Sequence, residues 1–178
     1  MIHASSTETA QMVRTIMTND EWDECGDALH MLVCLQDQIS REALKSLYPT
    51  LHSYMLECTS KIRHLLPQPV FAMGLDAARR CIDGELDRKT LEWLDWYLEA
   101  ECFAFDYSAD SQEVLNTISQ VKEVRDLPHE EAVTVLRDAA YFAEGAIYGL
   151  LPGKNSTNRA KFLCPDLLRK FLHAPFDL

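Results

Sequence analysis

Glycine and proline are scarce in this chain of 178 residues, which has six glycines and seven prolines. Most of them stand where a helix would start or stop, and alternation of apolar and polar residues with a period of two is nearly absent. A β-sandwich or β-barrel needs many turns between alternating strands, so both are excluded. The sequence predicts an all-α fold.

Basic residues are also few, with 17 Lys and Arg against 28 Asp and Glu, for a net charge of −11. Because phosphate contacts need clustered Lys and Arg, direct binding of nucleic acid is excluded. No run approaches the roughly 20 apolar residues of a membrane span, and the first ten residues lack the pattern of a signal peptide. The six cysteines contain no CxxC pair, which indicates reduced core thiols. We therefore expect a mature, cytoplasmic protein that does not contact the membrane.

Sequence motifs of catalysis are missing too. The chain has no GxSxG and no HExxH, and residues 149–156, GLLPGKNS, depart from a phosphate-binding loop in glycine spacing and in the residue after Lys. One face of a helix predicted over 20–38 carries four metal-ligand types, Asp23, Asp27, His30 and Cys34. A single straight helix brings only two such residues, four apart, to one ion. We expect no catalytic residues, no cofactor and no metal.

Helical periodicity is what the chain has in abundance. It predicts one domain over 1–178, a bundle of eight or nine helices, with residues 65–69 as the best place for a division into subdomains. The predicted helices cover 7–18, 20–38, 41–47, 49–66, 70–83, 88–107, 111–125, 128–151 and 156–173. We expect Pro165 to split or kink the last of these.

The negative charge is concentrated in two segments. Residues 1–40 hold seven acids and one arginine, and residues 83–113 hold ten acids, one arginine and one lysine. A field of this kind steers a basic partner toward the chain, whereas an ordinary solvated face interleaves both signs. The sequence leaves both interpretations open. The candidate partner-binding residues are Asp20, Asp23, Glu24, Asp27, Glu92, Asp95, Glu99 and Asp106.

The helix predicted over 88–107 has a narrow acidic stripe flanked by two apolar sets. Leu91, Leu94, Leu98, Cys102 and Phe105 form one set, and Trp93, Trp96, Ala100 and Phe103 form the other. We expect only the acidic stripe to face water. Glu101 lies within the apolar arc, so we expect a buried structural charge paired with Arg79, Arg80 or Arg137.

Three stretches carry a resemblance to a known class of proteins. They are AARRCIDGELD at 77–87, LEWLDWYLEAE at 91–101 and DAAYFAEGAI at 138–147. Together they resemble the helical immunity proteins of bacterial polymorphic-toxin and contact-dependent systems, over about residues 70–151. The resemblance implies a non-catalytic, cytoplasmic protein that binds a cognate toxin and blocks its active site or substrate groove. Nuclease toxins have basic grooves, which suits the charge of this chain.

Two other classes of function remain open. One is an enzyme or ligand-binding bundle with a cavity lined by Trp93, Trp96, Tyr97 and Tyr141. The other is an adaptor, or a phage-encoded inhibitor of a machine that processes nucleic acid. We expect a basic toxin as the partner, with an aromatic residue such as Trp22 or Trp93 as the anchor if it is exposed. The oligomeric state does not follow from the sequence.

Overall fold

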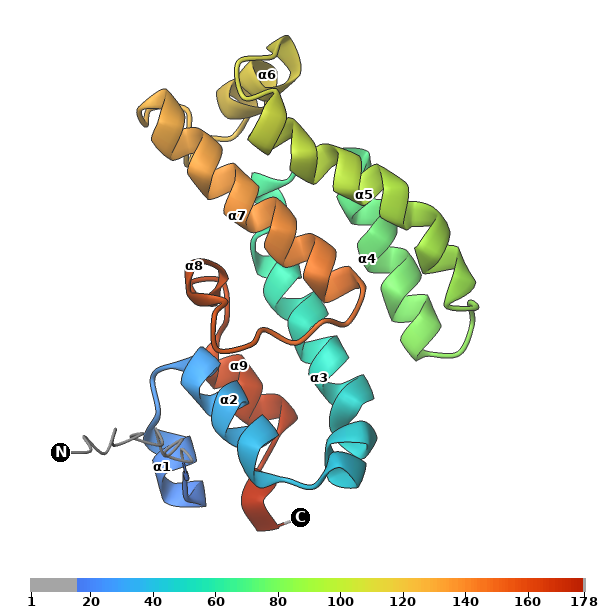
Figure 1. The fold of residues 1–178 in the computed structure, drawn as a ribbon, viewed down its shortest axis with the longest axis vertical. Helices are drawn as coiled ribbons and strands as arrows, with labels where there is room; N and C mark the ends of the chain where they lie inside the picture. Colours follow the sequence, from blue (N-terminus) through green and yellow to red (C-terminus); the bar gives the residue numbers. More distant parts are fainter. Residues whose placement is uncertain (1–15, 178) are drawn as a thin grey trace, which may run out of the picture.

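The computed structural model describes residues 16–177, and it is all-α in that range, as predicted (Figure 1). These residues form nine α-helices and two short 3-10 helices, η1 and η2. In chain order they are α1 Asn19–Glu24, α2 Ala28–Gln38, α3 Arg41–Lys61, η1 Arg63–Leu65, α4 Pro69–Ile82, α5 Lys89–Tyr107, α6 Gln112–Gln120, α7 His129–Ile147, α8 Thr157–Ala160, α9 Pro165–Phe171 and η2 Pro175–Asp177.

The helices enclose two hydrophobic cores. The first lies among α4, α5 and α7 and includes Phe71, Leu98 and Leu136, all fully buried. The second lies among α1, α2, α3 and α9 and includes Trp22 and Tyr54. Helices α3 and α7 contribute side chains to both cores and contact each other, so they join the two halves of the molecule. No helix among the described residues is long and apolar enough to cross a membrane.

The helix predicted over 20–38 is in fact two helices, α1 and α2, separated by residues 25–27. The Asp27 carboxylate accepts hydrogen bonds from the backbone N–H groups of Leu29 (2.9 Å) and His30 (3.1 Å), so it caps the start of α2. The expected face of four metal-ligand types is therefore wrong, because the break separates Asp23 from the others. The predicted helix over 7–18 lies largely outside the described residues, and residues 16–18 precede α1 without being helical.

The two helices predicted over 41–47 and 49–66 are a single helix, α3, which continues through Pro49. A proline inside a helix removes one backbone hydrogen bond, here to the carbonyl of Lys45. Both Lys45 and Pro49 are exposed, so this part of the helix faces water, which can hydrate the freed carbonyl. At the other end of the chain Pro165 splits the last predicted helix into α8 and α9, which confirms the expectation.

Helix α7 ends at a glycine that the local geometry requires. Gly149 has a φ of +72°, and its carbonyl accepts a hydrogen bond from the Tyr48 hydroxyl at 2.8 Å. A Cβ atom at this position would collide with the same hydroxyl oxygen. Both the positive φ and the close contact disfavour any L side chain.

We therefore expect Gly149→Ala to lower the free energy of unfolding by about 2 kcal/mol. Urea denaturation measures the change. Gly153→Ala is the matched control, because a Cβ atom added there would have no other atom within 4 Å and the φ of Gly153 is not positive. Equal midpoints for the two variants would contradict this explanation of the α7 terminus.

Candidate functional site

Helix α5 is the candidate site, and its inner side fixes it firmly to the body of the protein. Leu91, Leu94, Leu98, Cys102 and Phe105 are buried against α4 and α7, as predicted. Tyr148 follows the end of α7, and its hydroxyl group donates a hydrogen bond to the backbone carbonyl of Leu91 at 2.9 Å. The backbone carbonyl of Tyr148 accepts a hydrogen bond from the Arg88 guanidinium at 3.3 Å. These contacts hold the solvent-facing side of α5 in a defined orientation.

The solvent-facing side of α5 carries a row of aromatic residues. Trp93, Trp96 and Phe103 were expected from the sequence to lie in a buried apolar flank, and that expectation was wrong. The exposed fractions are 63% for Trp93, 77% for Trp96, 50% for Tyr97, 45% for Phe103 and 82% for Tyr107. We call these five residues the aromatic ridge. Single exposed apolar residues are ordinary, but five aromatic residues along one helix form a contiguous apolar surface. Surfaces of that kind are typical of protein-binding sites.

An acidic group borders the aromatic ridge on the side of α7. Carboxylate oxygens of Asp95, Glu99 and Glu144 lie within 4.8 Å of one another. Burial raises the pKa of Glu144, and the nearby charges of Glu99 and Asp95 add to the rise, although Arg159 opposes it. The three carboxylates therefore repel one another, and a cation placed among them would relieve the repulsion. We call them the acidic triad. Sequence reasoning missed Glu144, because it comes from a helix distant in the sequence.

The remaining acidic residues of α5 differ in their surroundings. Asp106 is tied to α7, since it accepts a hydrogen bond from the Tyr141 hydroxyl at 2.5 Å and lies 3.8 Å from Arg137. Glu92 is exposed. Within residues 16–177, none of the ion pairs involves Glu92, Asp95 or Glu99. Of the four predicted binding residues in α5, Glu92 and Glu99 are exposed without an ion pair, Asp95 is half-buried beside the Tyr148 side chain, and Asp106 is engaged internally.

The acidic residues near the start of the chain do not join this surface. Asp20, Asp23 and Glu24 are exposed on α1, and Asp27 is the cap of α2. Figure 1 shows α1 and α5 on opposite sides of the molecule. The start of α1 has a capping box formed by Thr18 and Glu21. The eight predicted binding residues therefore belong to two separate surfaces.

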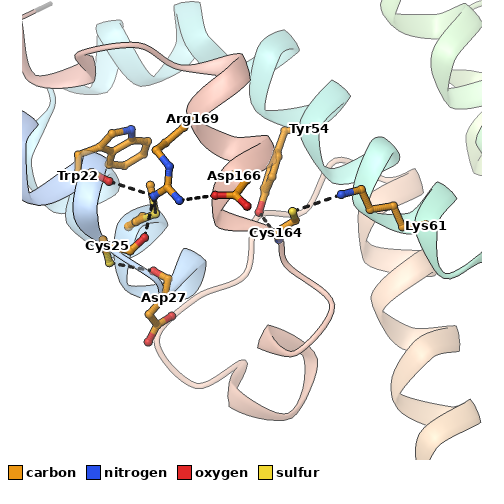
Figure 2. Close-up of polar contacts among 9 residues, drawn as sticks. Trp22, Cys25, Asp27, Tyr54, Lys61, Cys164, Asp166 and Arg169 are labelled. Atoms are coloured by element: carbon orange, nitrogen blue, oxygen red, sulfur yellow. Dashed lines mark hydrogen bonds and ion pairs between the residues drawn. The ribbon is translucent and has the colours of Figure 1, made fainter.

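Trp22 is excluded as an anchor, because its side chain is fully buried in the second core. Arg169 of α9 holds this region together (Figure 2). Its guanidinium donates to the carbonyl oxygens of Cys25 (2.7 Å) and Trp22 (3.3 Å) at the end of α1, and to the Asp166 carboxylate (2.6 Å). A positive charge at the end of a helix satisfies its free carbonyl groups. Arg169 therefore fastens α1 to α9.

The expected ion pair of Glu101 is absent from the described residues. Arg79 pairs with Glu57, Arg80 with Asp76 and Glu85, and Arg137 with Asp106. Glu101 is half-buried on α5. Burial raises the pKa of Glu101, and the negative charge of Glu113 on α6 raises it further. The prediction of a buried, paired Glu101 was therefore wrong, because each candidate arginine has a nearer carboxylate.

Without an ion pair, the charged form of Glu101 destabilises the folded protein. The folded state holds the proton of this carboxyl more tightly than the unfolded state, so its contribution to stability is lost as pH rises above the ordinary pKa of 4.5. We expect Glu101→Gln to raise the melting temperature at pH 7 and to leave it unchanged at pH 3. Glu92→Gln, on the exposed side of the same helix, is the control and should change neither value. A lower melting temperature for Glu101→Gln at pH 7 would restore the ion-pair hypothesis.

The cavity that an enzyme or ligand-binding bundle would need is not lined by the expected residues. Trp93, Trp96 and Tyr97 are exposed and face away from both cores. Tyr141 lines a shallow polar hollow of about 350 Å³ with residues of the loop before α8. The predicted aromatic-lined cavity was therefore wrong. The same aromatic residues instead form an outward-facing surface.

No protein-family model, curated protein or solved structure matches the chain.

Proposed function

We propose that this chain is a binding protein that captures a positively charged protein partner on the solvent-facing side of α5. The observation that carries the proposal is the aromatic ridge beside the carboxylates of Glu92, Asp95 and Glu99, which have no ion pair within residues 16–177. The two components contribute in different ways.

The aromatic ridge supplies the affinity. Tryptophan and tyrosine are the residues most often found as hot spots, because they bury a large apolar area with little loss of side-chain freedom. Leaving five such rings in water is unfavourable for the isolated protein. Contact with a partner removes this cost.

The acidic residues supply the attraction and the choice of partner. Carboxylates without an internal ion pair, on a chain with a net charge of −11, attract a basic surface over a distance of about one Debye length. They also repel acidic proteins and nucleic acids. A basic protein is therefore the partner whose charge fits.

A toxin with a basic substrate groove, such as a nuclease, is the partner class that we infer. The proposed role is that of an immunity protein in the cytoplasm, which neutralises such a toxin by covering its groove. A reading frame directly upstream that encodes a toxin would support this role, so the product of that frame, here called the adjacent-frame protein, is the first partner to test. Mixing the two purified proteins should give a stable complex of one copy each, and co-expression should restore growth to cells that make the adjacent protein. A mixture that elutes as two separate proteins, together with continued growth arrest, would refute this assignment.

Charge reversal on the two acidic surfaces distinguishes a binding site from a general effect of net charge. The triple variant Glu92→Lys, Asp95→Lys and Glu99→Lys should slow association with the adjacent-frame protein at least about tenfold at low salt. The matched control is Asp20→Lys, Asp23→Lys and Glu24→Lys on α1, which changes the net charge by the same amount. Stopped-flow measurement of the association rate at several salt concentrations compares them. Equal slowing by the two triples would contradict a site on α5.

A further inference from the structure

The solvent-facing side of α5 carries two parallel rows of residues with a regular spacing. In each row the residues follow one another in alternating steps of four and three. The first row is Glu92, Trp96, Glu99, Phe103 and Asp106. The second row is Trp93, Tyr97, Ala100, Ala104 and Tyr107. Spacing of this kind keeps a row of side chains on one line along a helix, as in the contact seams of coiled coils. Each row extends over about 14 residues, which is about 21 Å at roughly 1.5 Å per residue.

The second row is shaped like a saddle. At one end the rings of Trp93 and Tyr97 pack with their centres 5.3 Å apart. At the other end the ring of Tyr107 packs on that of Phe103, which belongs to the first row, with the centres 5.8 Å apart. Ala100 and Ala104 lie between these two pairs, and Ala100 is exposed. Small residues at the middle of a contact row allow the backbone of another helix to approach closely. The saddle therefore leaves room for another helix to approach α5 closely.

The first row alternates carboxylates with aromatic rings. Glu92 and Glu99 lie on either side of Trp96 along the helix, and Asp95 and Glu144 complete the acidic border. A planar guanidinium group can pair with a carboxylate through two hydrogen bonds while it stacks flat on an aromatic ring, whereas an ammonium group has neither the paired geometry nor a plane to stack. The chemistry of this row therefore selects arginine over lysine.

We infer that the segment bound by α5 is an amphipathic helix of the partner, with aliphatic side chains such as leucine over Ala100 and Ala104 and with arginines over the acidic border. This inference rests on the proposed function and names the part of the partner that is recognised. A second copy of this chain is disfavoured as the occupant, because a two-fold antiparallel contact sets the acidic border of one copy against that of the other.

Three synthetic peptides of about 18 residues test the inference with the full chain. The first has leucines in the four-and-three pattern and arginines on both flanks, the second has the same residues in scrambled order, and the third has lysine in place of arginine. Isothermal titration gives the dissociation constants, and circular dichroism reports helix formation by the bound peptide. The first peptide should bind at least about tenfold more tightly than either of the others and become helical.

Two variants of the protein locate the contact. Ala100→Trp fills the saddle and should abolish the preference for the first peptide, whereas Ala72→Trp, at an exposed alanine of α4, should keep it. Equal affinities for the ordered and scrambled peptides would overturn the inference. It would also be overturned if the wild-type chain formed a dimer and Ala100→Trp converted that dimer to a monomer, because a second copy would then occupy the surface. If the peptides bind equally while the adjacent-frame protein still binds, only the helical occupant is wrong. Failure of that protein and of all the peptides to bind would reject the proposed function as well.

Discussion

Replacing Trp93 and Trp96 together by alanine is expected to weaken binding of the adjacent-frame protein by about 100-fold. These two side chains have exposed fractions of 63% and 77% and lie at one end of the aromatic ridge. Their truncation removes apolar area that a partner would bury, and it removes no side chain from either hydrophobic core. The melting temperature should stay nearly the same, because both side chains are exposed and belong to neither core. Isothermal titration and thermal unfolding provide the two values.

The matched control for this variant is the pair Met73→Ala and Leu115→Ala. Both residues are exposed and apolar, but they belong to α4 and α6. Binding by this control should equal that of the wild type. An affinity that falls equally in both double variants would show that exposed apolar area in general, and not the aromatic ridge, is responsible.

Arg169→Met is expected to lower the free energy of unfolding by about 3 kcal/mol. Methionine keeps most of the volume of arginine but donates no hydrogen bond, so the carbonyl groups of Trp22 and Cys25 lose the guanidinium that satisfies them. The second core should loosen where α1 meets α9. Trp22 is fully buried there, whereas Trp93 and Trp96 are exposed, so a loss of the short-wavelength part of the tryptophan emission reports the change.

Lys170→Met is the control for this stability prediction. Lys170 is the next residue of α9, is exposed, and carries the same charge. Chemical denaturation should place its midpoint near that of the wild type. Similar losses in the two variants would mean that the charge of α9, rather than the contact with α1, stabilises this region.

The fold class and the buried side of α5 follow from the sequence because helical periodicity marks the residues that pack inward. The exposed side of α5 does not follow. Trp93 and Trp96 have the same apolar character as core residues, and only the positions of α4 and α7 determine that they face water. A protein surface that binds a partner departs from the usual pattern of polar residues, so sequence reasoning fails at such a site.

Two further features depend on contacts between residues that are distant in the chain. The acidic triad combines Asp95 and Glu99 of α5 with Glu144 of α7, and periodicity within one helix cannot reveal this. The pairing of Arg79 and Arg137 with Glu57 and Asp106 likewise depends on which helices are neighbours. By contrast, the break before α2 has a local cause, since Gly26 and the capping residue Asp27 are both visible in the sequence.

Oxidative footprinting of the tryptophans tests the central claim, that the solvent-facing side of α5 is the partner-binding surface, most directly. The chain has three tryptophans, of which Trp22 is buried while Trp93 and Trp96 lie on the aromatic ridge. Hydroxyl radicals should modify Trp93 and Trp96 in the free protein and spare Trp22. In the complex saturated with the adjacent-frame protein, modification of Trp93 and Trp96 should fall to the level of Trp22. Unchanged modification of both residues in the saturated complex would contradict the account, because the partner would then bind elsewhere.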